Sequence, residues 1–404
     1  MVYNIKRDRF GNIDKYKCRL VAKGFKQIAG RDYDEVFAPT AQQASLRILI
    51  AVTAAVGLDL DQIDVKTAFL NGDLEEEVYL KLPAEFGGKT WRLRKALYGL
   101  KQAARAWHNK QRESMLKVGF KPSPHDLCLF VLGNGDSRVY MLIHVDDALI
   151  AGHKKFVEIA KKKVADCFEI KDMGSAKYFL GLEIIRNPDQ SISLSQRKYA
   201  REVLVRFGME DSKPQSTPLE VGVSLSKKEG TPLEDTSEYS EVLGSLMYLA
   251  CNTRPDLCHS VSMLARFMSQ PTDLHWQALK RILRYLKGSV DRCITYATTS
   301  KQGVPSVVTF SDADFAADKD KRRSTTGTVV TINGRAILWM SKLQSIVATS
   351  AAEAEFIAAV AATKESLSVR KMLSEIYGFV QPVDLRVGNH QTHQAAHSRT
   401  VRTH

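Results

Sequence analysis

Two adjacent carboxylates, Asp146 and Asp147, are the residues of this sequence whose types and spacing most directly suggest chemistry. They separate two apolar runs, 139–143 and 148–151, in a pattern that predicts a β-hairpin with both acids at its tight turn. Neighbouring carboxylates repel each other unless a cation offsets their charge. Asp is also common in turns, so the pair alone favours neither a metal site nor a plain turn.

A third carboxylate, Asp64, makes a metal site the better hypothesis. It lies in another short apolar segment, which is followed by a turn at Asn71 and Gly72. Three aspartates from two strands are the hard oxygen donors expected for a pair of Mg²⁺ ions, with Mn²⁺ as an alternative.

The composition is that of a folded protein with a polyanionic partner. The 404 residues predict two or three domains, and 44% hydrophobic with 25% charged residues is ordinary for a globular chain. The net charge of +13 favours a polyanionic partner, although a basic charge that serves solubility is a competing explanation.

Targeting signals are not expected. The first ten residues carry charges too early for a signal peptide, and no apolar run reaches the length of about 18 residues needed to span a membrane. The six cysteines form no Cys-x-x-Cys pair, which predicts reduced thiols in an intracellular protein.

Several elements can be predicted around these acids. Apolar periodicity predicts helices over 44–56, 95–120 and 273–288, the last with Asp273 and Gly288 as its caps. In that last helix, Leu279, Ile282, Leu283 and Leu286 form the apolar stripe.

Near the C-terminus, a strand over 307–312 is expected to end in an acid. Two further strands, 328–332 and 336–339, are expected to join at Asn333 and Gly334, and a long helix is expected over about 350–377.

Three ordered blocks resemble the palm motifs of reverse transcriptases from copia-type LTR retrotransposons. They are Asp64-Val-Lys-Thr-Ala-Phe-Leu-Asn-Gly-Asp-Leu, Leu97-Tyr-Gly-Leu-Lys-Gln-Ala-Ala-Arg-Ala-Trp and His144-Val-Asp-Asp. Further blocks that are similar to this family lie at 16–25, 37–39, 181–184, 244–250, 253–256 and 283–288.

The resemblance implies an α+β right-hand polymerase. Residues 1–185 would form fingers and a palm with a ferredoxin-like antiparallel sheet, and 186–300 a largely helical thumb and connection. Residues 301–404 would form an RNase H-like mixed α/β domain. The sequence is expected to be a fragment of a Pol polyprotein, clipped at its N-terminus. It would be found in a cytoplasmic virus-like particle or in the nucleus.

The implied activity is RNA-directed DNA synthesis from an RNA template, a DNA primer and dNTPs. By family motif, Asp64 and Asp146 would bind the two Mg²⁺ ions directly, Asp147 would lie next to the primer end, and the carbonyl of Val65 would be an extra donor. The oligomeric state and the primer stay open.

Other site residues follow from the same motifs. Phe69 would exclude a 2′-hydroxyl, or else be a plain core aromatic. The remaining nucleotide contacts would be Arg19 and Lys23 for the triphosphate, and Tyr98, Gly99, Lys101 and Gln102. Trp107 is expected in the core. The basic face of the 273–288 helix, formed by Lys280, Arg284 and Lys287, is either a solvated surface or a phosphate-binding rail, and a neighbouring palm favours the rail.

The C-terminal residues match only part of an RNase H site. Asp312 and Glu355 correspond to two of the family's four metal-binding carboxylates, whereas the third position reads Gly388 followed by Asn389. Asp384 is expected at the start of its strand, and Asp314 and Glu353 are expected to be poorly placed. The tail histidines (His390, His393, His397 and His404) could suggest a metal site, although a degraded end is favoured.

Three residues depart from the family pattern, and three functions are open. His144 and His108 stand where the family has Tyr, and Ala104 where it has Pro or Gly. The preferred function is a reverse transcriptase with an inactive RNase H domain. A catalytically dead relic that only binds nucleic acid is the alternative, and a DNA-templated polymerase is a third.

Overall fold

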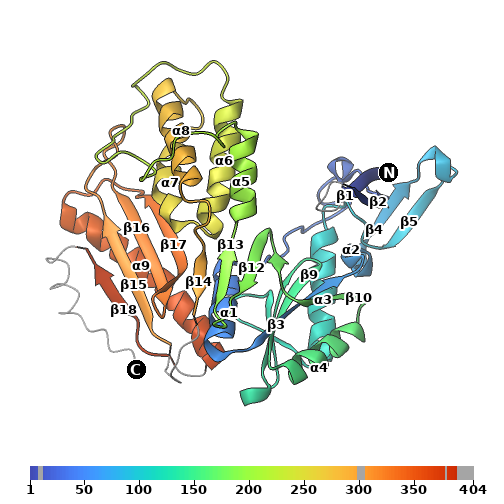
Figure 1. Ribbon diagram of the computed structural model, residues 1–404. Coiled ribbons are helices and arrows are strands. Elements are labelled where there is room, and N and C mark those ends of the chain that lie inside the picture. Colours follow the sequence, from blue (N-terminus) through green and yellow to red (C-terminus); the bar gives the residue numbers. More distant parts are fainter. Residues whose placement is uncertain (8–11, 298–304, 378–379, 389–404) are drawn as a thin grey trace. The chain divides into compact units, whose positions relative to one another are not determined.

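The computed structural model describes residues 1–7, 12–297, 305–377 and 380–388 (Figure 1). Its contacts divide the chain into two compact units. The first contains residues 1–49 and 58–176, and the second contains 50–57 and 177–404. The three domains expected from the sequence, with boundaries after residues 185 and 300, stay a prediction.

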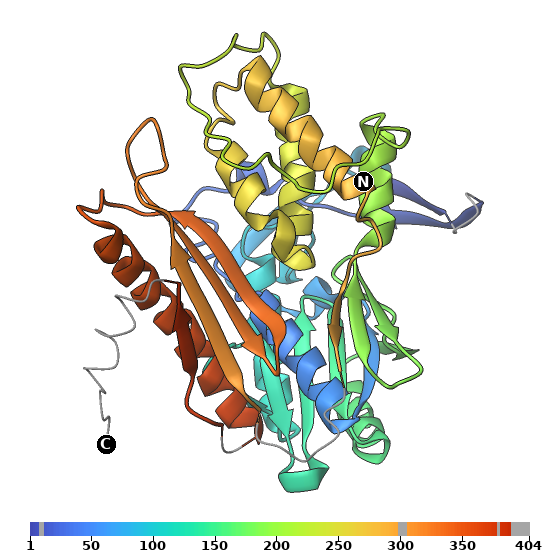
Figure 2. The ribbon, with the colours of Figure 1, turned by 60° about the vertical axis from the view of Figure 1, so that its left-hand side comes forward.

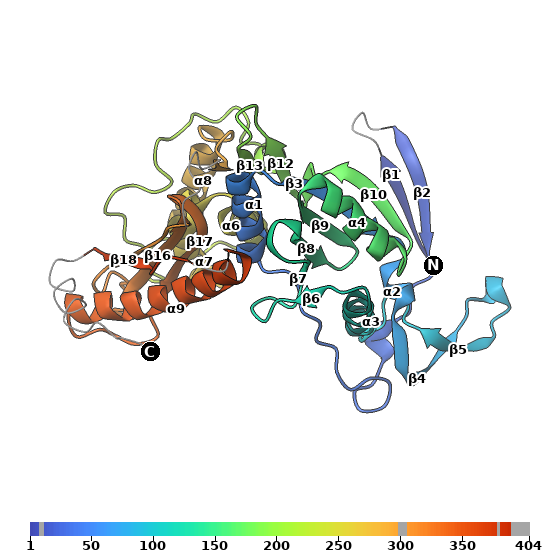
Figure 3. The ribbon, with the colours of Figure 1, turned by 90° about the horizontal axis from the view of Figure 1, so that it is seen from below.

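A six-stranded sheet in the order β10-β3-β9-β8-β7-β6 is the centre of the first unit (Figure 3). Apart from the additional strands β4 to β7, four neighbouring strands (β10, β3, β9 and β8) and two helices follow each other along the chain as βαββαβ, that is β3-α3-β8-β9-α4-β10, with every strand pair antiparallel. The elements are β3 (Asp59–Val65), α3 (Ala103–Lys117), β6 (Lys121–Pro122), β7 (Leu129–Leu132), β8 (Val139–His144), β9 (Asp147–Gly152), α4 (Lys154–Ala165) and β10 (Ile170–Ser175).

One face of this sheet is buried under α3 and α4. Alternate residues of β3, Ile63 and Val65, pack with Trp107 and Met115 of α3 and with Val157 of α4. Because strand side chains alternate between faces, Gln62 and Asp64 lie on the opposite face. The predicted hairpin and the core position of Trp107 are confirmed, but only Asp146 lies in the turn, because Asp147 is already paired with His144 as the first residue of β9.

Two hairpins complete the first unit and project from the sheet (Figure 3). They pair β1 (Val2–Arg7) with β2 (Ile13–Arg19), and β4 (Asp73–Lys81) with β5 (Thr90–Lys95). A four-residue helix, α2 (Ala68–Asn71), follows β3. The predicted helix over 44–56 is confirmed as α1 (Gln43–Val56).

The helix predicted over 95–120 begins later than expected. Residues 90–95 form β5, and α3 starts only at Ala103. Between them Gly99 has a φ of +91°, and a Cβ there would lie 2.2 Å from the carbonyl oxygen of Ala22. The turn is fixed by this distant contact, which includes a 2.7 Å hydrogen bond from the Ala22 N–H to the Tyr98 carbonyl.

The second unit contains a helical cluster and two four-stranded sheets. The helices α5 (Arg197–Arg206), α6 (Ser237–Asn252), α7 (Cys258–Ala265) and α8 (Asp273–Lys287) share one apolar core. The smaller sheet has the order β11-β12-β13-β14. Its strands are β11 (Tyr178–Phe179), β12 (Leu182–Arg186), β13 (Ile192–Ser195) and β14 (Ile294–Tyr296).

The apolar stripe of α8 is buried as predicted and Gly288 is its C-cap as predicted, but Asp273 is not its N-cap. Thr272 is the N-cap, because its hydroxyl and backbone N–H both contact Nδ1 of His275, at 3.0 and 2.9 Å. Asp273 accepts a hydrogen bond from the backbone N–H of Thr231. Gly288 ends the helix in a right-handed conformation, so this position does not need the ability of glycine to adopt a positive φ.

The C-terminal sheet has the order β17-β16-β15-β18, and α9 (Ala351–Tyr377) packs along it (Figure 2). Its strands are β15 (Val307–Ala313), β16 (Thr325–Ile332), β17 (Arg335–Leu343) and β18 (Asp384–Val387), and β18 is parallel to β15. The predicted turn is confirmed, since Asn333 and Gly334 both have positive φ.

Side chains of α7 in the helical cluster and of β14 in the smaller sheet bind the edge strand β17. The Ser262 hydroxyl donates to the Ser341 carbonyl at 2.8 Å, and the Tyr296 hydroxyl to the Ala336 carbonyl at 2.9 Å. Trp339 of β17 donates its indole N–H to the Ala250 carbonyl at 2.7 Å. These bonds attach the sheet to the helices within one unit.

No helix among the described residues is long and apolar enough to cross a membrane. All six cysteines are free, which confirms the predicted thiols.

Candidate functional site

The β-sheet of the first unit brings Asp64 and Asp147 together. They are direct partners across the antiparallel pair β3–β9, and opposite residues of such a pair lie on the same face. His144 of β8 is paired with Asp147 in turn, and Lys171 of β10 is paired with Asp64. Four strands therefore place His144, Asp147, Asp64 and Lys171 in one row.

Asp146 reaches the same place from a strained turn. Val145 and Asp146 are the two residues between the paired His144 and Asp147, and Val145 has a φ of +58°. A β-branched residue in the left-handed region costs about 1–3 kcal/mol and persists only when its surroundings fix it.

Two hydrogen bonds fix this turn. The indole N–H of Trp107 donates to the Val145 carbonyl at 2.7 Å, and the Val65 N–H donates to the Asp146 carbonyl at the same distance. Trp107 is itself buried at 2% exposure and packs edge to face on Phe168. The turn thus holds the exposed carboxylate of Asp146 beside the end of β3.

Negative charge is concentrated at this point. Burial raises the pKa of Asp147 to about 6, a hydrogen bond from Gln62 opposes that rise, and the charges of Asp146 and Asp64 add to it. Burial also lowers the pKa of His144, which disfavours an imidazolium beside the acids. A cation would relieve the repulsion.

The donor set fits a hard cation, although the three acids do not yet form a cage. Carboxylate oxygen is what Mg²⁺ prefers. Within the described ranges, no three His, Cys, Asp or Glu side chains are arranged to hold a metal by themselves. One reason is visible: an oxygen of Asp147 accepts a 2.7 Å hydrogen bond from the Gln62 amide.

An aromatic pair lies next to the acids. Phe69 and Tyr98 meet edge to face with centroids 5.2 Å apart, and the Arg19 guanidinium lies 5.4 Å from the Tyr98 ring. Burial raises the pKa of Tyr98, and the charges of Asp146 and Asp64 raise it further. Three of the predicted nucleotide contacts are therefore brought together beside the acids.

The other predicted nucleotide contacts have different surroundings. Lys23 lines a pocket of about 560 Å³ together with Lys26 and Lys81. Gln102 is buried, and its amide bonds to the Asp32 carbonyl and to the side chain of Gln27. These bonds indicate a structural role for Gln102, and the close approach to Ala22 indicates the same for Gly99. Lys101 is exposed and bonds to Gln27 through its backbone N–H.

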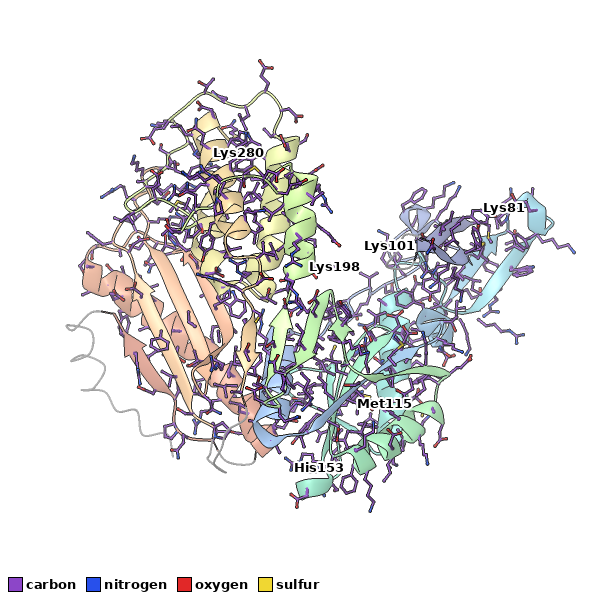
Figure 4. All side chains as sticks on the ribbon, viewed as in Figure 1. Lys81, Lys101, Met115, His153, Lys198 and Lys280 are labelled. Atoms are coloured by element: carbon purple, nitrogen blue, oxygen red, sulfur yellow. The ribbon has the colours of Figure 1, made fainter. Side chains whose placement is uncertain are left out.

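The basic face of α8 is partly used within the protein. Arg284 donates to the Lys213 carbonyl at 2.8 Å, and Lys287 donates to the Glu210 carbonyl. Lys280 is exposed on α8 (Figure 4). Its Nζ lies over the Trp276 ring, 5.0 Å from the ring centroid. Nucleic-acid binding by this face stays a prediction.

In the second unit, Asp312 and Glu355 are brought together. Burial raises the pKa of Glu355, and the neighbouring charge and hydrogen bond of Asp312 add to this effect. Gly388 lies against the same carboxylate, because a Cβ at Gly388 would be 2.7 Å from an oxygen of Asp312.

The nearby acids are used elsewhere or lie too far along the sheet. Asp314 accepts hydrogen bonds from the backbone N–H groups of Ala317 and Thr325, and Glu353 binds Thr349. Asp384 pairs with Val308, which confirms its expected place at the start of the strand.

Five of the predicted residues lie outside the part of the chain that the structure describes, and two residues beside the acids were not predicted. Asn389 and the histidines at 390, 393, 397 and 404 lie outside the described residues. Gln62 and Lys171 were missed. Strand alternation from Asp64 would have put Gln62 on its face, whereas the register that pairs Lys171 with Asp64 has no sequence signal.

Comparison with known proteins gives consistent matches. Residues 1–221 match the family model described as reverse transcriptase (RNA-dependent DNA polymerase). The chain is 41% identical over 390 residues to the retrovirus-related Pol polyprotein from transposon TNT 1-94 of Nicotiana tabacum. This match covers 93% of the chain and 29% of the polyprotein, so the chain spans less than a third of that relative.

Two further matches differ in how much they cover. A transposon Ty5-1 protein of Saccharomyces cerevisiae is 31% identical over 304 residues, which is 74% of this chain and 98% of that protein. A solved foamy viral protease-reverse transcriptase in complex with dsDNA has 12% identity and a TM-score of 0.48. It covers 90% of this chain and 66% of that one.

Proposed function

Because the chain belongs to the reverse transcriptase (RNA-dependent DNA polymerase) family, we propose that it is an RNA-directed DNA polymerase with Asp64, Asp146 and Asp147 as its active site. The observation that carries this proposal is the register of β3 against β9, which makes Asp64 and Asp147 direct partners. The strained turn adds Asp146 to them.

The chain's own residues would act as follows. Asp64 and Asp146 would hold two Mg²⁺ ions, with the Val65 carbonyl as a further donor and Asp147 next to the primer end. Bound there, the ions would lower the pKa of the primer 3′-hydroxyl and neutralise the leaving pyrophosphate. The Val145 turn holds Asp146 in place before the substrate binds, so little reorganisation is needed.

Nucleotide recognition would fall to the aromatic pair and the neighbouring cations. Phe69 would lie under the deoxyribose, supported from the side by Tyr98. Arg19, held over the Tyr98 ring, and Lys23 would bind the triphosphate. A guanidinium that is already held in position loses less freedom on binding than a free one.

The fold supports this assignment. The βαββαβ order supports a ferredoxin-like palm, and the α5–α8 cluster with the C-terminal sheet supports a thumb, a connection and an RNase H-like domain. RNA template, DNA primer and dNTPs would be the partners, consistent with the net charge of +13. An intracellular retrotransposon particle or the nucleus would be the location.

The RNase H-like domain would be inactive. Two-metal hydrolysis needs several carboxylates, because the attacking and leaving oxygens must both be neutralised. Asp312 and Glu355 supply two carboxylates, and Gly388, which stands at the family's third position, has no side chain beside Asp312. The purified chain is therefore expected not to cut an RNA–DNA hybrid with Mg²⁺ or Mn²⁺. Hybrid-specific cuts that Asp312→Asn abolishes would contradict this.

Primer extension on poly-rA/oligo-dT with Mg²⁺ tests the synthesis proposal. Asp146→Asn is expected to lower the rate by at least about three orders of magnitude, because it removes a ligand of both ions. Its binding to the template–primer is expected to change little. Unchanged synthesis by this variant would refute the assignment, and binding without any synthesis by the unmodified chain would favour the relic.

A further inference from the structure

We propose that Gln62 is a positioning residue whose amide holds the carboxylate of Asp147 away from Asp64 and Asp146. This inference rests on the proposed role of these acids in metal binding. Its central observation is the hydrogen bond from Nε2 of Gln62 to Oδ1 of Asp147, 2.7 Å long, between residues 85 positions apart in the chain.

The sheet register explains why Gln62 can do this. Gln62 and Asp64 lie two residues apart on β3, so their side chains share a face. Asp147 is opposite Asp64, whereas Gln62 is opposite Leu149, so the amide reaches diagonally across the β3–β9 pair. Diagonal neighbours are about 7–8 Å apart at their Cα atoms, which a long side chain can span and a short one cannot.

The chemistry of glutamine suits the task. Its amide donates a hydrogen bond without adding a charge, whereas Glu would repel Asp147 and Lys would form an ion pair with it. The backbone N–H of Ala148 also bonds to the Asp147 carboxylate. Two donors thus orient this carboxylate, which is consistent with the absence of a three-acid cage among the residues that the structure describes.

The functional consequence is weak metal binding by the free chain. With Asp147 restrained, two carboxylates are left to hold a cation until the substrate phosphates supply more oxygen ligands. Gln62→Met keeps the length of the side chain and removes the donor. Asp147 can then turn toward Asp64 and Asp146, and the affinity of the free chain for Mn²⁺ is expected to rise at least threefold.

A double-mutant cycle measured by electron paramagnetic resonance of free Mn²⁺ tests this coupling. The chain without substrate is titrated as the unmodified form, Gln62→Met, Asp147→Asn and the double variant. The rise caused by Gln62→Met is expected to vanish in the Asp147→Asn background, because the effect acts through Asp147. Gln62→Asn, which is too short to reach, is expected to behave like Gln62→Met.

Gln344→Met is the matched control. Gln344 is also buried, donates from Nε2 to Thr326 and to the Ala354 carbonyl, and belongs to the other unit. This variant is expected to bind Mn²⁺ as the unmodified chain does. Circular dichroism at the titration temperature shows that each variant is folded before its affinity is compared.

Two results would overturn the inference. One is equal Mn²⁺ affinity, or equal lack of binding, for the unmodified chain and for both Gln62 variants. The other is a rise that persists without the Asp147 carboxylate, since Gln62 would then act by another route. In primer extension, Gln62→Met is expected to lower the maximal rate about tenfold with the KM for nucleotide within twofold. If the unmodified chain extends no primer, the polymerase assignment fails, whereas the Mn²⁺ cycle still decides the role of Gln62.

Discussion

Replacing Asp147 by Asn should stabilise the folded chain at neutral pH while it impairs synthesis. The pKa of this carboxyl rises from an ordinary 3.8 to about 6 in the folded state, chiefly because the group is buried. That difference corresponds to about 3 kcal/mol of disfavoured ionisation. Because the side chain is partly accessible to solvent, we expect about half of this, ~1.5 kcal/mol.

The sign depends on pH. Between about pH 4 and pH 6 the folded chain binds more protons at Asp147 than the unfolded chain does, so stability falls as the pH rises through this window. The destabilising contribution is complete above pH 6 and absent below pH 4. Asn carries no charge and can still accept the hydrogen bond from Gln62. The Asp147→Asn variant is therefore more stable than the unmodified chain only at the higher pH.

Thermal unfolding without divalent ions measures this effect. For a unit of this size, ~1.5 kcal/mol corresponds to a rise in midpoint of about 3–6 °C at pH 7.5. No rise is expected at pH 4. Asp146→Asn, the exposed neighbour, is the control and should give a smaller rise. An unchanged or lower midpoint for Asp147→Asn at pH 7.5, or an equal rise at pH 4, would refute the reasoning.

Three further predictions concern other contacts. Phe69→Ala should raise ribonucleotide incorporation relative to deoxyribonucleotide incorporation in primer extension; an equal loss for both would indicate a packing residue. Trp107→Phe removes the donor to the Val145 carbonyl, so it should lower the unfolding free energy by about 1–2 kcal/mol and slow synthesis. Gly388→Asp places a third carboxylate against Asp312, and its repulsion should lower the thermal midpoint when no metal is present. Adding Mn²⁺ should raise the midpoint of this variant back toward that of the unmodified chain. Gly388→Asn, uncharged, should not respond to Mn²⁺.

Elements defined by local patterns were predictable from the sequence. The hairpin with Asp146 at its turn follows from two apolar runs around an acidic pair, and α8 follows from its apolar stripe. The place of Asp384 at the start of its strand was also predictable, because the length of the strand and the position of Gly388 fix it.

Features set by distant contacts were not predictable. The late start of α3 depends on Ala22, whose carbonyl excludes any side chain at Gly99. From the sequence, the basic side chains of α8 are expected to face solvent or phosphate. In the structure, Arg284 and Lys287 instead donate hydrogen bonds to the carbonyls of Lys213 and Glu210. Lys171 opposite Asp64 depends on the register of β10, which shifts near Asp172 and has no local signature.

The attachment of β17 to the helical cluster has a consequence for dissecting the protein. β17 is the edge strand of its sheet, and Ser262 and Tyr296 donate hydrogen bonds to its carbonyls. An uncovered edge strand is a template on which other chains can pair and aggregate. Residues 305–404 expressed alone would lose this cover, so the isolated sheet should self-associate through β17. A soluble C-terminal fragment should therefore begin at about residue 177, so that it keeps β13 beside β14 and α5 in the core of the helical cluster.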